Sequence, residues 1–207
     1  MQNYPVTIAI IAINALFSIA GFNNHQLFNR FALSPAEIRN RRQYERFVTS
    51  GFLHADYLHL LFNMFTLFFF GQLVEQMITA ISGEWLYAVF YLVALVVADI
   101  PSYIKHRNDY NYRSIGASGA VSAVIFASIL LDPWAKIYIY VAIPIPAIVY
   151  AVLYIFYCIY AGRQRRDNIN HDAHLWGGIF GFVCMGLLDP SLFQGFVQQL
   201  MHPGWFH

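Results

Sequence analysis

The chain has 207 residues, of which 58% are hydrophobic and only 11% are charged. Soluble domains carry about 25% charged residues, so the composition excludes an ordinary soluble protein and indicates a membrane protein. The formal net charge of +1, without a basic patch interleaved with aromatic residues, gives no reason to expect a nucleic-acid partner. We expect a single all-α, polytopic membrane domain over 1–207, because little chain remains for a second domain.

Six apolar stretches predict six transmembrane helices, although the first, third and sixth are short for a span. The stretches cover roughly 6–20, 58–77, 85–100, 115–131, 137–160 and 173–188. The residues before the first stretch lack the basic charges of a signal peptide, so we interpret it as a retained span. In a six-helix bundle the second, fourth and sixth helices run in the same direction. Their first turns therefore lie on one side of the membrane.

Two further segments are predicted to lie along the membrane surface. Residues 22–50 alternate aromatic and basic side chains, which suits an interfacial loop in the headgroup region, with a solvated loop as the alternative. Residues 190–207 are mildly amphipathic and predict an interfacial tail, with a frayed tail as the alternative.

The second apolar stretch contains two polar residues, His59 and Asn63, near its start. Their i, i+4 spacing puts both on one face of a helix, and both side chains can donate hydrogen bonds. Polar groups within a membrane are costly and are candidates for function. We interpret the pair as donors to the oxyanion of a tetrahedral intermediate. The alternative is a polar pair that joins two helices.

The fourth stretch opens with Gly116-Ala117-Ser118-Gly119. A serine in a membrane helix usually bonds to a carbonyl one turn earlier, but in the first turn that carbonyl lies outside the helix. Ser118 is therefore a candidate nucleophile, and its own N–H at the helix N-terminus is a further oxyanion donor.

The sixth stretch carries His174, the candidate general base. Asn170 or Asp172 is expected to cap this helix, and we favour Asp172. Two residues along a helix point to different faces, so Asp172 does not complete a triad and the predicted unit is a Ser–His dyad. The alternative is a structural histidine without a chemical role.

Small residues on the fourth and sixth helices predict that their backbones approach closely. Gly119 and Ala123 are spaced by four on one helix, and Gly177 and Gly181 are spaced by four on the other. A packing motif without chemistry is the alternative.

No metal or cofactor is expected. The metalloprotease pattern H-E-x-x-H is absent, and His54 and His59, five residues apart, do not share a helix face. Cys158 and Cys184 lie in apolar runs and are interpreted as packing residues.

The three motifs together resemble those of the rhomboid family of intramembrane serine proteases, in order, helix number and spacing. They are His59-Leu60-Leu61-Phe62-Asn63, Gly116-Ala117-Ser118-Gly119, and His174-Leu175-Trp176-Gly177 with Gly181. The resemblance implies a six-helix bundle in which Ser118 is the nucleophile and His174 the base. It implies an oxyanion site made by His59, Asn63 and the Ser118 N–H.

The resemblance also covers positions outside these motifs. His54 matches a recurrent histidine, and Arg46 matches the arginine of a Trp-Arg pair whose tryptophan is replaced here by Glu45. Ser122 stands where relatives have a tyrosine that packs on the base.

For the whole protein, the resemblance implies proteolysis of transmembrane protein substrates, with membrane lipids as the other partners. Residues 163–172 are expected to form a lid, and Pro144 and Pro146 to loosen the fifth helix. The absence of further domains suggests a prokaryotic plasma membrane. The oligomeric state and the natural substrate do not follow from the sequence.

Two points stay open. Basic residues concentrate on the predicted site side, which the positive-inside rule assigns to the cytoplasm, whereas the resemblance implies the opposite orientation. The main alternative function is a catalytically silent relative that binds membrane helices, and a second is a small transporter with a histidine proton relay.

Overall fold

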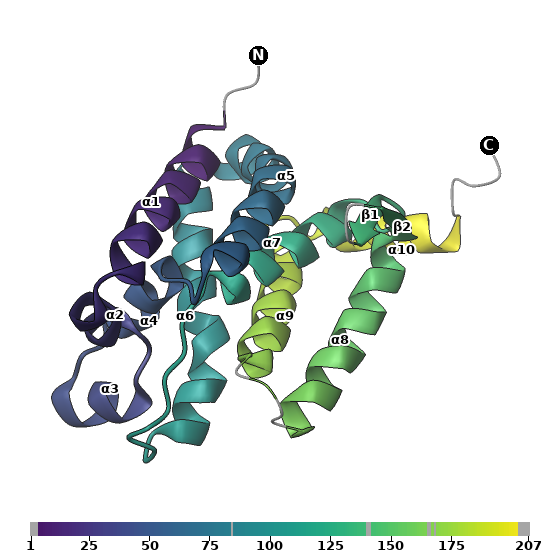
Figure 1. The fold of residues 1–207 in the computed structure, drawn as a ribbon. Helices are drawn as coiled ribbons and strands as arrows, with labels where there is room; N and C mark the ends of the chain where they lie inside the picture. The colour runs from purple at the N-terminus through teal and green to yellow at the C-terminus, as the bar shows by residue number, and fades with distance from the viewer. Residues whose placement is uncertain (1–3, 84, 140–141, 165–166, 168, 203–207) are drawn as a thin grey trace.

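The computed structural model describes residues 4–83, 85–139, 142–164, 167 and 169–202. Within these residues the chain folds into a helical bundle (Figure 1). Its long helices are α1 (Pro5–Phe22), α5 (Tyr57–Ser82), α6 (Trp85–His106), α7 (Ser118–Leu131), α8 (Ala147–Gln164) and α9 (His171–Leu188). The most extensive helix contact joins α7 to α9, and α5, α6 and α8 pack around this pair. We call the end of the bundle where α5, α7 and α9 begin the site end.

The helices lie near the predicted positions, but the count of six spans is not established. By length and composition, α1, α5, α6 and α8 are suited to cross a membrane. A fifth span results if α9 and α10 (Ser191–Met201), bent by 113°, are counted together. Helix α7 has 14 residues, about 21 Å at 1.5 Å per residue, against a hydrocarbon core of about 30 Å. It is buried inside the bundle over most of its length.

The predicted helix over 137–160 is wrong in its first part. Strands β1 (Lys136–Ile139) and β2 (Ile143–Pro146) form an antiparallel hairpin, and α8 begins only at Ala147. Proline lacks an N–H and disfavours helical geometry in the residue before it, so the Ile143-Pro144-Ile145-Pro146 run is extended. The two prolines therefore precede the fifth long helix, and the prediction that they loosen it is wrong.

The segment 22–50 forms short helices at the site end: α2 (His25–Phe31), α3 (Pro35–Arg41) and α4 (Arg46–Thr49), followed by the single turn η1 (Ser50–Phe52). The buried guanidinium of Arg46 donates to the carbonyl oxygens of Asn29 and Ala32, at 2.9 and 2.6 Å. Glu45, at the position of the family tryptophan, pairs with Arg30 at 2.8 Å. The hydrogen bond from Arg30 holds the pKa of Glu45 below its ordinary value.

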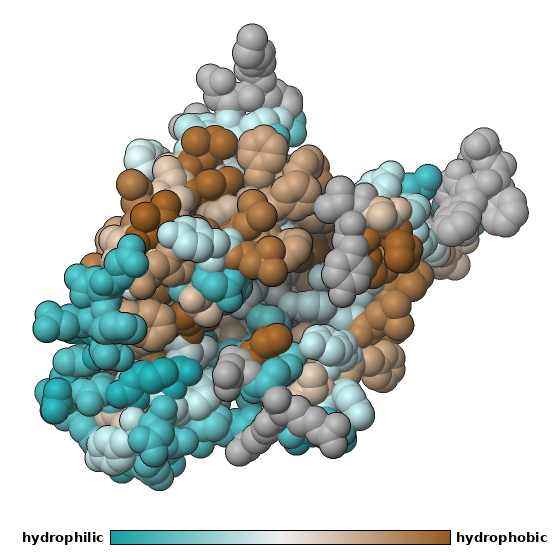
Figure 2. All heavy atoms as spheres, viewed as in Figure 1, coloured by the Kyte–Doolittle hydropathy of each residue, from teal (hydrophilic) through white to brown (hydrophobic). Residues whose placement is uncertain are grey.

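The surface divides into polar and apolar zones (Figure 2). Hydrophilic residues gather over α2 and α3 at the lower left, whereas hydrophobic residues cover α1, α5 and the outer side of α8. At the end of the bundle away from the site, the indole of Trp134 donates to the carbonyl of Gln199 on α10, at 2.8 Å. Of the predicted interfacial tail, residues 191–201 are helical, and 203–207 lie outside the described residues.

Candidate active site

The hydroxyl of Ser118 and the imidazole of His174 meet between α7 and α9. The distance from His174 Nε2 to Ser118 Oγ is 2.8 Å, and both side chains are half-buried. Ser118 is the first residue of α7, and His174 lies in the first turn of α9. A nucleophile and its base need about 2.6–3.2 Å between heavy atoms, and the pair meets this requirement.

Glycines on α9 make the short distance possible. A Cβ on Gly177 would overlap the carbonyl oxygen of Gly119, and a Cβ on Gly181 would overlap that of Ala123. The two backbones are therefore in direct contact along successive turns, as the small-residue spacing predicts. Any larger side chain at either glycine separates the helices that carry Ser118 and His174.

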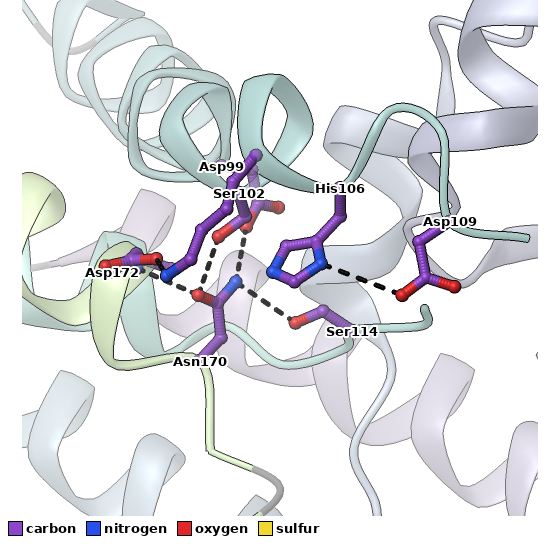
Figure 3. Close-up of polar contacts among 9 residues, drawn as sticks. Asp99, Ser102, His106, Asp109, Ser114, Asn170 and Asp172 are labelled. Carbon is purple, nitrogen blue, oxygen red and sulfur yellow. Dashed lines mark hydrogen bonds and ion pairs between the residues drawn. The ribbon is translucent and has the colours of Figure 1, made fainter. Parts of the chain in front are cut away.

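Asn170 fixes the start of α9 against its neighbours (Figure 3). Its Oδ1 accepts from the N–H of Ala173 at 3.1 Å and from the hydroxyl of Ser102 on α6 at 2.7 Å. Its Nδ2 donates to Asp99 and to the Ser114 hydroxyl, each at 3.2 Å. One amide thus joins α6, α9 and the segment before α7.

The favoured cap, Asp172, is wrong. Asn170 caps α9, while the carboxylate of Asp172 pairs with Lys105 of α6 at 2.6 Å. Asp172 already lies inside the first turn of α9, two residues after the cap position. Because the Asp172 carboxylate pairs with Lys105, it is not directed at His174, in agreement with a dyad without a third member.

A tyrosine that the sequence reasoning missed packs on the candidate base. The ring of Tyr154, on α8, stacks on His174 with 6.1 Å between ring centroids and 15° between planes. Its hydroxyl bonds to Ser122 Oγ at 2.8 Å. The resemblance implies a tyrosine at position 122, where this chain has serine, and here the ring that stacks on His174 comes from α8. Tyr154 also stacks on Tyr150, one turn earlier on α8, with 5.4 Å between ring centroids, but this spacing within one helix gives no signal of the contact with His174.

His59 approaches the same region from α5. The residue at position 116 has φ +122°, a conformation that glycine adopts without strain. A Cβ on Gly116 would lie 3.0 Å from His59 Nε2 and 3.7 Å from Ser118 Oγ, so the glycine leaves room for the imidazole beside the hydroxyl. His59 Nδ1 accepts from the N–H of Ala55 at 3.4 Å, which assigns the ring hydrogen to Nε2.

Asn63 is buried one turn further along α5. Its Nδ2 donates to the carbonyl of His59 at 3.2 Å, so one of its two amide hydrogens is used within its own helix. Arg46, in contrast, donates to backbone carbonyl oxygens of α2 and of Ala32, the residue after it. It therefore stabilises the segment 22–50 and does not reach the dyad.

His54 lies behind His59, outside the helices. Its Nδ1 lies 2.8 Å from Ser18 Oγ, and the two imidazole rings meet edge to face at 4.9 Å between centroids. Burial lowers the pKa of His54 to about 3, with a smaller contribution from His59, while Asp56 acts in the opposite direction. The ring is therefore neutral at physiological pH.

A pocket of about 370 Å³ opens at the site end, next to the start of α9. It is lined by residues of α6, the segment 111–114, the end of α8 and α9, among them His106, Gly162, Asp167 and His171. Burial raises the pKa of the Asp167 carboxyl, but the N–H of Ile169 and the contact with His171 outweigh this and leave it below its ordinary value. Of the predicted lid, 163–172, residues 167 and 169–172 border this pocket, and 165, 166 and 168 lie outside the described residues.

Apolar helices of spanning length, with a serine–histidine pair between two helices of the bundle, define a helical membrane protein with a candidate hydrolytic site. A family model of the rhomboid domain matches residues 41–191, more than half of the chain. The chain therefore belongs to the rhomboid family. This family acts on membrane-protein substrates within the membrane, and the assignment agrees with an integral membrane protein.

Three similar proteins illustrate the range of the family. RHOMBOID-like protein 12, mitochondrial, of Arabidopsis thaliana is 30% identical over 84% of this chain and 54% of its own length. Rhomboid-like protein 11, chloroplastic, of the same plant is 31% identical over 89% of this chain and 63% of its own. The protein named "Putative rhomboid protease YdcA" of Bacillus subtilis is 28% identical over 67% of this chain and 64% of its own. The chain thus spans 54% to 64% of the length of these relatives.

Proposed function

We propose that this protein is an intramembrane serine endopeptidase that cleaves transmembrane segments of membrane proteins. The observation that carries the proposal is the 2.8 Å contact between Ser118 Oγ and His174 Nε2. Membership of the rhomboid family supports it, as does the similarity to a Bacillus subtilis protein whose name includes "protease".

In the proposed reaction, Ser118 Oγ attacks the scissile carbonyl carbon while His174 Nε2 takes its proton. The protonated His174 then gives this proton to the leaving amine nitrogen, and an acyl-enzyme remains on Ser118. Water, deprotonated by His174, attacks the ester carbonyl, and His174 returns this proton to Ser118 Oγ as the acyl product leaves.

The oxyanion is assigned to three donors: His59 Nε2–H, the second amide hydrogen of Asn63 and the N–H of Ser118. The ring hydrogen on Nε2 of His59 and the space beside Gly116 support the first assignment. In a well-studied hydrolase, one such donor is worth about 2.7–4 kcal/mol of transition-state stabilisation.

No carboxylate is assigned to orient the base. In the proposed site the stacked ring of Tyr154 and the direct backbone contact of α7 with α9 hold the imidazole of His174 in place. His54, Gly116, Gly119, Gly177, Gly181 and Arg46 support the site without touching the reacting atoms. The pocket at the site end supplies a path for water.

We further propose that the described chain forms one rhomboid domain in which α1, α5, α6, α7, α8 and α9 make up a six-helix membrane bundle. For orientation we follow the resemblance, which turns the site end away from the cytoplasm. A prokaryotic plasma membrane stays a proposal, since two of the three relatives have organellar names and the third is bacterial.

The test is cleavage of a single-span substrate in reconstituted liposomes. Wild-type protein should cleave it, whereas Ser118→Ala and His174→Ala should each reduce the rate by about a thousandfold or more, as removal of a nucleophile or base does in serine hydrolases. Ser191→Ala, which removes a hydroxyl on α10 bonded only to Asp189 in the described chain, is the matched control and should retain activity.

Cleavage that persists in both dyad variants would disprove the proposed chemistry. If wild-type protein cleaves none of a panel of spans but binds them, the catalytically silent alternative is correct.

A further inference from the structure

A cysteine and two histidines from two helices converge around His174 of the proposed dyad. Cys158 lies on α8, and His171 and His174 lie one turn apart on α9. One ligand atom from each, the thiol sulfur and a nitrogen of each ring, lies within 4.8 Å of the other two. No pattern within one helix reveals this group, because its members are brought together by the α8–α9 contact.

His171 already has the environment of a metal-binding histidine. Its Nε2 lies 3.1 and 3.2 Å from the two carboxylate oxygens of Asp167, which assigns the ring hydrogen to Nε2. Its Nδ1 therefore carries the lone pair. Metal-bound histidines almost always donate their other ring N–H to a carboxylate, a carbonyl or water, and this contact fixes the ring.

That lone pair is buried without a partner. His171 is only 3% exposed, and its Nδ1 has no hydrogen-bond partner among the described residues. A buried nitrogen lone pair without a donor is costly, and such a group calls for an explanation, such as an ion. A cation at the centre of the Cys158, His171 and His174 group would supply the missing partner.

We propose that Cys158, His171 and His174 bind a soft divalent cation of the zinc class, and that this cation inhibits the protease. One thiolate and two imidazoles are a ligand set that zinc prefers, with the fourth position open to water. The inhibitory part rests on the proposed function, whereas binding of the cation does not.

The geometry requires only local movement. Bonds of about 2.0–2.3 Å to a tetrahedral ion place its ligand atoms roughly 3.3–3.8 Å apart. The present separations of up to 4.8 Å must therefore close by up to about 1.5 Å. Cys158 lies on α8, whose other buried residues are only Ala147 and Ala151, so this helix has room to adjust. The pocket lined by Gly162, Asp167 and His171 gives the ion a route from the site end.

Inhibition follows whichever nitrogen of His174 binds the ion. Binding through Nε2 displaces Ser118, the present partner of that atom. Binding through Nδ1 leaves the neutral ring with its hydrogen on Nε2, so Nε2 can no longer accept the serine proton. On binding, the ion exchanges hydration waters for the Cys158 sulfur and one nitrogen of each histidine, and the Cys158 thiol proton goes to solvent.

Cobalt(II) is the probe for binding, because its thiolate complexes absorb strongly in the near ultraviolet. Wild-type protein in detergent should develop this thiolate band on titration with Co²⁺, and Zn²⁺ should abolish it. Cys158→Ala should lose the band, and Cys184→Ala, which removes the other free thiol, should keep it. Asp167→Asn, an exposed change, should weaken Co²⁺ binding by about 10–100-fold.

Inhibition is measured separately, as cleavage against buffered free Zn²⁺ with Mg²⁺ as the control ion. Zn²⁺ should inhibit wild type and Cys184→Ala alike, and Cys158→Ala should need at least about tenfold more Zn²⁺, since one of three protein ligands is lost. Mg²⁺ should have no effect, because it prefers oxygen ligands.

Absence of the band in wild type, or its loss in Cys184→Ala, would overturn the site. A band with the expected variant pattern but equal zinc inhibition of Cys158→Ala would overturn the inhibitory role. If the band behaves as expected and no preparation cleaves any substrate, the metal site stands and the proposed function fails.

Discussion

Helices α7 and α8 flank His174 but are held in the bundle in different ways. Helix α7 carries Ser118 and is buried over nearly its whole length, with its backbone against the glycines of α9. Helix α8 carries Tyr154 and Cys158 and buries only three residues, while large apolar side chains such as Leu153 and Phe156 are exposed.

The difference indicates which half of the site is fixed. Lipid tails are as apolar as leucine, so exposed apolar side chains on α8 do not press that helix against the bundle in a membrane. The packed α7–α9 pair therefore sets the distance between Ser118 and His174. Helix α8 contributes the stacked ring of Tyr154 and the thiol of Cys158, and both groups shift when this helix shifts. The predictions below test this division between a fixed and an adjustable side.

The largest effect is expected from Gly181→Ala, on the fixed side. The new Cβ would overlap the backbone carbonyl of Ala123, and backbone cannot rotate away as a side chain can. Overpacking of a core typically costs about 1–3 kcal/mol and occasionally more, and this site belongs to the upper end. We expect loss of cleavage together with a lower midpoint of unfolding in dodecyl sulfate.

The matched change on the adjustable side is Gly162→Ala. A Cβ there would lie 3.4 Å from His171 Cβ, an ordinary contact, and alanine favours a helix over glycine by about 0.5–1 kcal/mol. This variant should be as stable as wild type or slightly more so. Equal losses in both variants would mean that α7 and α8 are held alike.

A smaller effect is expected from the pH dependence of stability, through His54. This residue lies behind His59, outside the α7–α9 pair. Ser18 Oγ donates to the carbonyl of Phe52 at 3.0 Å, so it accepts from His54 Nδ1–H, and His54 Nε2 is buried without a partner among the described residues. The pKa of His54 is about 3 in the folded protein, mainly because of burial, against 6.5 ordinarily. The unfolded chain therefore binds a proton over a range of pH in which the folded one does not.

Stability should accordingly be full above about pH 6.5 and fall as the pH drops toward 3. Between pH 7 and pH 5 this one group should cost about 2 kcal/mol. His54→Asn should remove that part of the pH slope, whatever its effect at pH 7, and His25→Asn, at an exposed histidine, should keep it. Unfolding in dodecyl sulfate at several pH values measures the slope, and an unchanged slope in His54→Asn would refute the assignment.

The sequence was most informative where one helix carries its own pattern. The small-residue spacing of Gly177 and Gly181 predicted the contact with the fourth long helix, and the motif around Ser118 predicted the partner of His174. Each motif is local in sequence, because a fixed helical period places its residues on one face, and the shared direction of the helices and the family resemblance supplied the pairing between them.

The sequence was least informative where side chains from distant segments meet, and where the backbone limits of proline, not the apolar pattern, decide the secondary structure. Apolar content alone extended the fifth helix through Pro144 and Pro146, although proline disrupts a helix interior and is tolerated in an edge strand such as β2. Tyr154 supports His174 across two helices, a contact that no spacing within one helix can indicate. The choice of Asn170 over Asp172 as cap depended on partners on α6.

The smallest effect is expected from Tyr154, on the adjustable side. Replacing Tyr154 with alanine removes the ring stacked on His174 but leaves the contact between Ser118 and His174 to the α7–α9 pair. An aromatic pair is worth about 0.5–1.5 kcal/mol, so kcat should fall by up to about tenfold with KM little changed. Tyr154→Phe keeps the ring and loses the hydroxyl's bonds to Ser122 and Cys158, and should retain most of the activity. Tyr160→Ala removes an exposed ring from the same helix and should leave kcat at the wild-type value. A loss in Tyr154→Ala as large as that in His174→Ala would show that α8, and not only the α7–α9 pair, holds the base in place.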